Sequence, residues 1–289
     1  MARALSEQFL HDLNPEKGGR YGELVKRVRR DKDLDLEFRG DYIDIYFQGH
    51  MILNLTQDGA IKVGKAFTVD GFHPLREKIA DVDSYIEVLP VLKDNISCHT
   101  KEDEEGKRIS KKNRELEFEQ LLIRANNRET SYNPDYIILD RQYRLPKGKR
   151  IDLIALRYSS RGKPTGYLSI IEVKYAQNRD IQDIRSQIEE YGRYFKDNIE
   201  DISSDMEKVL RQKLELGLVS RTKERLKWLK NDAFEINRDI RSTEILVYLI
   251  DYNPKSTLKN KMKEPSFPGK IRYAYGGLAL WQSRFIDFG

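Results

Sequence analysis

The residues of this chain whose types and spacing could do chemistry are two carboxylates and one ammonium group near the ends of two apolar runs. Asp152 interrupts the first run, residues 151–156, and Glu172 and Lys174 stand at the end of the second, residues 167–173. Both runs have the length of strands, and the turn-rich segment between them predicts a β-hairpin. Because side chains alternate along a strand, Glu172 and Lys174 are expected on one face, where Asp152 can join them.

This grouping of charges predicts a site for a divalent cation. Two carboxylates in a buried or half-buried position repel each other, and a cation bound between them relieves the repulsion while Lys174 balances the remaining charge. Hard oxygen ligands favour Mg²⁺ or Mn²⁺ over zinc. Such a metal can polarise a phosphoryl oxygen and lower the pKa of a bound water, which is the chemistry of phosphodiester hydrolysis. The alternative for Glu172 and Lys174 is a salt bridge on the protein surface.

The same three residues resemble the signature of the PD-(D/E)XK nuclease superfamily: an Asp, a variable gap, then Asp or Glu, any residue, and Lys. Here nineteen residues separate Asp152 from Glu172, Lys174 completes the signature, and Ile151 precedes the Asp where the family has Pro. The resemblance implies that Asp152 and Glu172 hold Mg²⁺, for which Mn²⁺ substitutes, with the backbone carbonyl of Val173 as a further ligand. It also implies that Lys174 orients or activates the attacking water.

Two expected helices carry further candidates. The first, residues 114–126, contains Glu115 beside its apolar stripe, and the resemblance implies a Glu of this helix as a metal ligand, with Glu115 the best fit and Glu119 the second. On the helix after Lys174, Gln187 and Tyr191 are four residues apart and therefore neighbours. They resemble the Gln-x-x-x-Tyr motif of the RecB and lambda-exonuclease-like branch. That likeness implies a catalytic role for both and a preference for nucleic-acid ends.

A run of cations leads into the Asp152 strand and is the expected phosphate-binding segment. It contains no acid, and its cations are Arg141, Arg144, Lys147, Lys149 and Arg150. We take Arg144, Lys147, Lys149 and Arg150 as nucleic-acid-binding residues, because clustered cations beside an anionic cleft attract a polyanion. The alternative for any one of them is a solvated hairpin tip.

The elements that must position these residues follow from hydrophobic periodicity. Residues 114–251 predict a helix, three strands, a helix and a strand, an αβββαβ order that is also the restriction-endonuclease-like core implied by the resemblance. Before it, the first 30 residues are expected to be helical. Four short strands of an antiparallel meander (34–39, 42–47, 51–55 and 61–63) and a helix over 75–92 follow. The expected fold class is therefore α/β (α+β).

We expect three parts along the chain: an accessory α/β module (1–100), a charged linker (101–113), and a nuclease domain (114–289) with a helical insertion (197–239). The segment 255–272 is expected to be a basic loop, followed by a last strand, 271–281. In that strand Tyr273, Tyr275 and Trp281 are expected in the core, with base stacking as the alternative.

Composition narrows the class of protein. The chain has 289 residues, one cysteine and four histidines, which disfavours a disulfide framework, a structural zinc site and a His-based catalyst. No apolar run approaches the roughly 18 residues that span a membrane, so we expect a soluble, cytoplasmic protein with no membrane partner. The net charge of +5 is modest, but its local clustering favours a polyanionic partner.

The sequence therefore predicts a Mg²⁺-dependent deoxyribonuclease that hydrolyses phosphodiester bonds, with DNA as the favoured partner and possible end-directed action. Two alternatives stay open: a structure- or sequence-specific endonuclease of the same fold, and a protein that binds nucleic acid without cleaving it. The sequence does not decide between a monomer and a homodimer.

Overall fold

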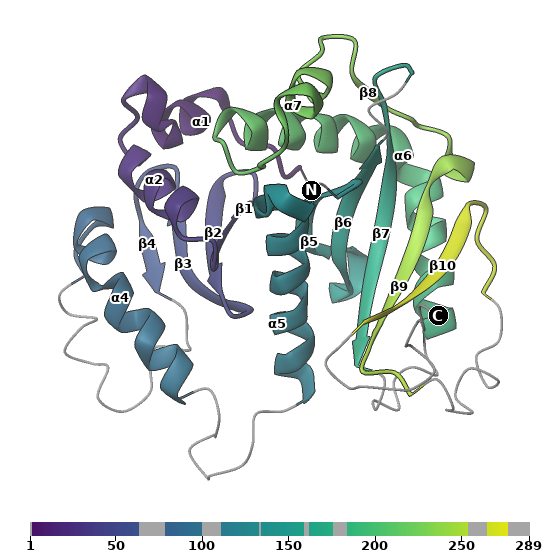
Figure 1. Ribbon diagram of the computed structural model, residues 1–289, viewed down its shortest axis with the longest axis horizontal. Coiled ribbons are helices and arrows are strands. Elements are labelled where there is room, and N and C mark those ends of the chain that lie inside the picture. Colours follow the sequence, from purple (N-terminus) through teal and green to yellow (C-terminus); the bar gives the residue numbers. More distant parts are fainter. Residues whose placement is uncertain are drawn as a thin grey trace, which may run out of the picture.

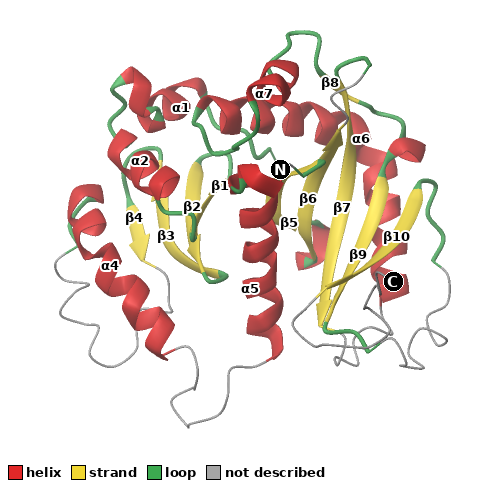
Figure 2. Ribbon diagram, viewed as in Figure 1, coloured by secondary structure: helices red, strands yellow, loops and turns green. Residues whose placement is uncertain are grey.

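Two β-sheets and the helices around them make up the described part of the chain, which in the computed structural model comprises residues 2–63, 79–99, 111–132, 134–158, 162–175, 184–253 and 265–276. One sheet has four antiparallel strands and the other has six strands of mixed direction (Figures 1 and 2). The expected mixture of helices and strands is confirmed. No helix in these ranges is both long and apolar enough to cross a membrane.

The four-stranded sheet is the predicted N-terminal meander. Its strands are β1 (Leu34–Phe38), β2 (Tyr42–Phe47), β3 (His50–Thr56) and β4 (Ile61–Val63), in that spatial order. Each pairs antiparallel with the next. The tight turn between β2 and β3 uses Gln48 and Gly49 at φ 48° and 81°, a left-handed conformation that glycine adopts without steric cost.

Three helices flank this sheet: α1 (Glu7–Leu13), α2 (Gly22–Arg30) and α4 (Val82–His99). The N-terminal helical segment is thus broken after Leu13, where Asn14 ends α1 and its side chain caps a 3₁₀ turn. Helix α4 begins later than expected, because Asp81 accepts a hydrogen bond from the backbone N–H of Ser84 and acts as its N-terminal cap. Residues 75–78 of that prediction lie outside the described ranges.

The six-stranded sheet follows the predicted order of elements. Helix α5 (Lys111–Ile123) precedes an antiparallel trio, β5 (Tyr136–Arg144), β6 (Arg150–Tyr158) and β7 (Thr165–Tyr175). Helix α6 (Ile184–Glu215), helix α7 (Lys223–Leu229) and the short β8 (Glu235–Ile236) come next. Strands β9 (Glu244–Ile250) and β10 (Lys270–Gly276) complete the spatial order β10-β9-β7-β6-β5, with β8 beside β7. Both β9 and β10 run parallel to β7.

Short turns join these elements. They are 3₁₀ turns at Pro15–Lys17, Thr130–Tyr132, Pro146–Gly148 and Ile240–Ser242, and a π-helical turn at Arg124–Arg128.

Helices cover both faces of the six-stranded sheet. In Figure 1, α5 lies in front of the sheet and the first part of α6 lies behind it. The front cluster includes Ile123 of α5 with Val173 of β7, whereas the rear cluster includes Ile188 and Phe195 of α6 with Val247 of β9. Strands β6, β7 and β9 are therefore buried on both faces, which accounts for their nearly continuous apolar sequences.

Helix α6 agrees in part with the prediction. The 3.6-residue periodicity after Lys174 predicts a helix that begins near Asp180 as its N-cap and buries Ile184, Ile188, Tyr191 and Phe195. All four are buried, while Asp180 lies outside the described residues. The helix continues to Glu215, with a local departure from helical geometry at Asn198. Helix α7 and strand β8 occupy the rest of the predicted insertion.

Two detailed expectations are wrong. The periodicity of residues 114–126 predicts Leu121 in the apolar stripe of the helix, but Leu121 of α5 is 50% exposed. The predicted last strand is present as β10, which begins at Lys270, whereas residues 255–264 of the predicted basic loop lie outside the described ranges. Tyr273 and Tyr275 were expected in the core, yet they are 37% and 44% exposed, since β10 ends the sheet in the described part of the chain. Trp281 lies outside the described residues.

The two sheets share one hydrophobic core and are joined by buried ion pairs. Lys213 of α6 places its Nζ 2.9 Å from Oε1 of Glu37 on β1, and both side chains are almost fully buried. Asp140 of β5 likewise pairs with Arg39, at 2.5 Å, and with Arg3, at 2.9 Å. The division into module, linker and nuclease domain stays a prediction, and residues 101–110 of the linker lie outside the described ranges.

Candidate active site

Strand β7 carries two of the three predicted site residues. Nζ of Lys174 lies 2.7 Å from Oε1 of Glu172, and both side chains are buried. Val173, between them in the sequence, packs in the cluster beneath α5 on the opposite face. The predicted alternation is therefore confirmed, and an ordinary surface salt bridge is excluded because Glu172 is only 1% exposed.

The neighbouring strand β6 brings Asp152 to the same place. Leu153 pairs with Ile171 in the antiparallel register, so Asp152 lies beside the end of β7. Its Oδ2 accepts a hydrogen bond of 2.8 Å from the backbone N–H of Val173. The hairpin therefore brings Asp152, Glu172 and Lys174 together, as the sequence predicts.

The charges of this group are strongly coupled. Burial raises the pKa of Asp152 well above its usual range, and the carboxylates of Glu172 and Glu119 raise it further. Burial also raises the pKa of Glu172, although the ammonium group of Lys174 opposes the shift. Burial lowers the pKa of Lys174, but the attraction of Glu172 and Asp152 outweighs it, so the net pKa is raised and the side chain stays cationic at neutral pH.

Helix α6 supplies the predicted Tyr191. Its hydroxyl oxygen lies 3.0 Å from Oε2 of Glu172 and 2.9 Å from the backbone carbonyl oxygen of Arg150, so its proton can be donated to either acceptor. Burial, and then the charge of Glu172, raise the pKa of Tyr191, which keeps the hydroxyl protonated. Glu172 is therefore held from both sides, by Lys174 on one oxygen and by Tyr191 on the other.

Gln187 lies one helical turn before Tyr191 on the same helix, and its side chain is half-buried. Its Oε1 is buried and has no hydrogen-bond partner within the described residues. A buried amide oxygen without a partner is costly, which is a common property of groups that bind a ligand. The structure thus brings Tyr191 into contact with Glu172 and leaves the amide oxygen of Gln187, one turn away, without a partner among the described residues.

Both candidate glutamates of α5 lie close to the site, in different roles. Oε1 of Glu115 accepts a hydrogen bond of 3.0 Å from the backbone N–H of Tyr175, and its charge acts on Glu172 and Lys174. Glu119 is 1% exposed, and the side-chain amide of Gln142 donates to both of its oxygens at 3.0 Å. Because both carboxylate oxygens of Glu119 accept hydrogen bonds from Gln142, the geometry favours Glu115 as the helix residue that faces the site.

Arg141 is the residue whose place the sequence did not reveal. It belongs to the basic run that was expected to bind phosphate, but it is 0% exposed, because it lies inside β5 and not at the turn. Its Nη2 lies 3.3 Å from Oε2 of Glu119, its Nη1 lies 3.8 Å from Oδ2 of Asp35, and its guanidinium stacks on Tyr46. Arg141 therefore connects the N-terminal sheet to a carboxylate beside the site, and it contacts no solvent.

The rest of the basic run does lie at the surface. Arg144, Lys147 and Arg150 are exposed at the turn between β5 and β6. Lys149 instead forms an ion pair with Glu190, the neighbour of Tyr191 on α6. The turn is therefore docked against the helix that contacts Glu172, which places the exposed cations next to the site.

The carboxylate and carbonyl oxygens at this site are the type of donor atom that binds a hard divalent cation such as Mg²⁺. The ligand set implied by the resemblance is Asp152, Glu172, the carbonyl of Val173 and Glu115. A carboxylate offers about four lone-pair positions, so Asp152 and Glu172 keep acceptor capacity beyond their present partners. Within the described residues, no three His, Cys, Asp or Glu side chains are grouped closely enough to hold a metal. The donor set that fits is therefore the Asp152 and Glu172 pair with backbone oxygen.

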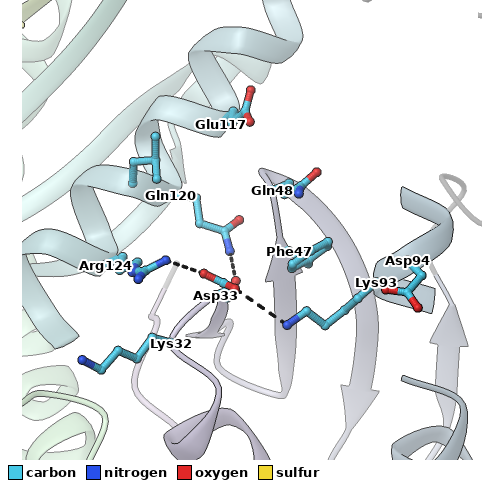
Figure 3. A pocket seen from close by; sticks show the side chains of 10 residues that line it. Lys32, Asp33, Phe47, Gln48, Lys93, Asp94, Glu117, Gln120 and Arg124 are labelled. Carbon is cyan, nitrogen blue, oxygen red and sulfur yellow. Dashed lines mark hydrogen bonds and ion pairs between the residues drawn. The ribbon is translucent and has the colours of Figure 1, made fainter. Parts of the chain in front are cut away.

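A cavity away from the candidate site is formed by residues that attach α5 to the N-terminal sheet. It lies between the N-terminal sheet and α5 (Figure 3), and none of the predicted site residues is among the described residues that line it. Several of its polar groups pair with one another: Asp33 binds Arg124 and, at 3.9 Å, Lys93, while the amide of Gln120 donates to the carbonyl oxygen of Asp33. These contacts attach α5 to the sheet, and we assign the pocket no ligand.

Comparisons of the chain with protein-family models, with curated proteins and with solved structures return no match. The functional assignment therefore depends on the geometry described above.

Proposed function

We propose that this chain is a divalent-metal-dependent nuclease of the PD-(D/E)XK type, with a restriction-endonuclease-like core, and that DNA is its favoured substrate. The observation that carries the proposal is the convergence of Asp152, Glu172 and Lys174 at one end of the sheet, with Tyr191 on Glu172. Burying two carboxylates together is costly unless they bind something. A bound divalent cation would satisfy both.

Each residue has a role that follows from its position. Asp152 and Glu172, with the Val173 carbonyl, would hold Mg²⁺ or Mn²⁺, and Glu115 is the further candidate. When bound, the metal supplies Lewis-acid polarisation of the phosphoryl oxygen and a more acidic water. Lys174 is cationic, so it stabilises negative charge that develops on the phosphate and orients the water. Its raised pKa argues against a role as general base.

Two residues of α6 would complete the site. Tyr191 fixes the orientation of the Glu172 carboxylate through its hydrogen bond. The amide oxygen of Gln187 has no partner in the described part of the chain, which suits a contact with a donor group of a substrate strand or with water. The cations Arg144, Lys147 and Arg150 would hold the phosphate backbone without reading bases.

The decisive experiment is a Mg²⁺-dependent cleavage assay on linear and circular, single- and double-stranded substrates. Wild-type protein should cleave and EDTA should stop it, while Asp152→Ala and Glu172→Ala should abolish cleavage but keep binding, since phosphate contacts come from other residues. Glu224→Gln, an exposed carboxylate on α7, is the matched control and should cleave normally. Undiminished cleavage by Glu172→Ala would disprove the assignment.

The same assay separates the alternatives. End-directed action predicts that closed circles resist, whereas nicking of circles without degradation from ends would indicate an endonuclease. Binding of nucleic acid with no cleavage under any metal condition would indicate a non-cleaving binding protein.

A further inference from the structure

Two exposed tyrosines on β10 are not used by the site described above. Tyr273 and Tyr275 are 37% and 44% exposed and lie two residues apart, so their side chains emerge on the same face of the strand. Large aromatic side chains contribute favourably when buried, and an exposed pair on one face therefore calls for an explanation.

The strand register aligns these tyrosines with the candidate site. Val247 of β9 pairs with Glu172 on one side and with Tyr273 on the other. Two residues further along, Leu249 pairs in the same way with Lys174 and Tyr275. Each tyrosine thus lies in the same cross-strand row as a site residue, two strands away, at a Cα distance of about 9.6 Å.

The tyrosines also share the face of the sheet that Glu172 uses. Glu172 contacts Tyr191 of α6, which defines the rear face. Ile271 of β10 packs against the core cluster on this face, and Tyr273 follows it by two residues. Tyr275 packs against Tyr252, with ring centroids 5.1 Å apart and an interplanar angle of 34°. Because Tyr252 is buried, it fixes the orientation of the exposed ring.

The charge of β10 suits a polyanion. Its sequence, KIRYAYG, contains two cations and no acid. Lys270 is exposed, and Arg272 is 51% exposed at its side chain, with its Nε 3.5 Å from Glu244. By the same alternation, Lys270 and Arg272 emerge on the face opposite the two tyrosines, so β10 offers aromatic rings on one face and cations on the other. Rings on which bases stack and cations that hold the backbone are the groups by which proteins bind single-stranded nucleic acid.

We propose that Tyr273 and Tyr275 form a platform on which bases of a single-stranded nucleic acid stack while its backbone reaches the Asp152 and Glu172 site. The inference rests on the proposed function and names its substrate class. The rings project from positions about 6.7 Å apart along the strand, roughly twice the 3.4 Å rise per base of a stacked helix. Successive bases can occupy both rings only if they are unstacked from each other, which excludes an intact duplex.

Binding measurements with matched oligonucleotides test the platform. We would measure affinity in EDTA for single-stranded DNA, single-stranded RNA, and abasic DNA of the same length and charge. Stacking on an aromatic ring is worth about 1–3 kcal/mol per base, or roughly 5- to 150-fold in affinity. Tyr273→Ala and Tyr275→Ala should each weaken binding of the base-containing strands at least about five-fold and leave the abasic strand unchanged.

Three further proteins complete the design. Tyr273→Phe and Tyr275→Phe keep the ring and should retain affinity. Leu121→Ala removes a similarly exposed apolar side chain from α5 and should bind normally. An equal loss on abasic and base-containing strands, or no loss at all, would overturn the platform.

The outcomes separate this inference from the proposed function. If wild type cleaves and both alanine variants cleave and bind like wild type, the platform alone is wrong. If wild type never cleaves but shows tyrosine-dependent binding of bases, the nuclease assignment is wrong and the platform stands. If wild type binds no single strand, the platform is overturned whether or not duplex is cleaved. Preference of the platform for DNA or RNA is decided by comparing those two arms.

Discussion

The hydroxyl oxygen of Tyr191 lies 3.0 Å from Oε2 of Glu172, while Oε1 of the same carboxylate lies 2.7 Å from Nζ of Lys174. One residue comes from a helix and the others from a strand, so the orientation of Glu172 depends on how α6 packs on the sheet. This arrangement gives Tyr191 a positioning role that packing alone would not require.

Tyr191→Phe tests that role, because it removes the hydroxyl and keeps the buried ring. Loss of a partner that orients a metal ligand typically costs 10- to 100-fold in metal affinity or activity. We therefore expect about that loss in Mn²⁺ affinity, measured by calorimetry, and in the cleavage rate. Tyr85→Phe is the control, since the buried hydroxyl of Tyr85 has no hydrogen-bond partner among the described residues. Equal behaviour of the two variants would reduce Tyr191 to a packing residue.

The buried pair of Arg141 and Glu119 gives a prediction for stability. Removing one partner of a buried ion pair leaves the other charge uncompensated, at a cost of about 3–5 kcal/mol. Arg141→Met should therefore lower the free energy of unfolding by about that amount, and Glu119→Gln added to it should recover part of the loss. Urea denaturation of the two single variants and the double variant measures the coupling. Simple additivity of the two substitutions would show that the pair is not energetically linked.

The cations at the β5–β6 turn should differ in their effect on binding. Arg144 and Lys147 are exposed, so replacing both by Ala should reduce the slope of log affinity against log salt by up to about two units. Lys149 is already paired with Glu190, and Lys149→Ala should add less than one unit. The loss should be the same for unrelated sequences, because phosphate contacts do not read bases. An unchanged slope would remove this turn from the binding surface.

Glu37 predicts a pH dependence of stability. Burial raises the pKa of Glu37 from 4.5 to about 8 despite the attraction of Lys213. Between pH 4.5 and about pH 8 the folded protein therefore holds a proton on Glu37 that the unfolded chain has lost. Its contribution to stability is then complete below about pH 4.5 and is lost as the pH rises through about 8. The resulting slope is at most about 1.4 kcal/mol per pH unit.

Glu37→Gln should flatten this decline when unfolding by urea is followed between pH 5 and 8.5. The exposed Glu224→Gln should leave the slope as it is in wild type. A Glu37→Gln protein whose stability falls as steeply as that of wild type would contradict the assignment.

The centre of the candidate site could be predicted because it depends on local rules. Asp152, Glu172 and Lys174 lie on adjacent strands of one hairpin, and strand alternation and hairpin pairing fix such positions over short stretches of chain. The convergence of these three residues therefore needed no knowledge of the remaining fold. Tyr191 was named only because Gln187 and Tyr191 resemble a family motif, and its contact with Glu172 depends on the packing of α6 on the sheet.

The positions of other residues, such as Arg141 and Tyr275, depend on contacts between distant segments of the chain. Local periodicity does not predict such contacts. Arg141 was expected at a surface because its neighbours in the sequence are basic, yet Asp35 of the N-terminal sheet and Glu119 of α5 bury it. Tyr275 was expected in the core because aromatic residues usually are, but its strand ends the described sheet. Neither position could be deduced without knowing which distant segments pack against β5 and which strand ends the described sheet.

The buried contact between Glu37 and Lys213 spans 176 residues of chain, and this separation has a consequence for synthesis. A ribosome adds about 5–20 residues per second, so roughly 9 to 35 s pass between the synthesis of β1 and that of its buried partner on α6. During this interval Glu37 has no Lys213 to contact, and the hydrophobic core that covers β1 is incomplete. We therefore expect nascent chains that end before residue 213 to be cleaved readily by added protease, and longer chains to become resistant.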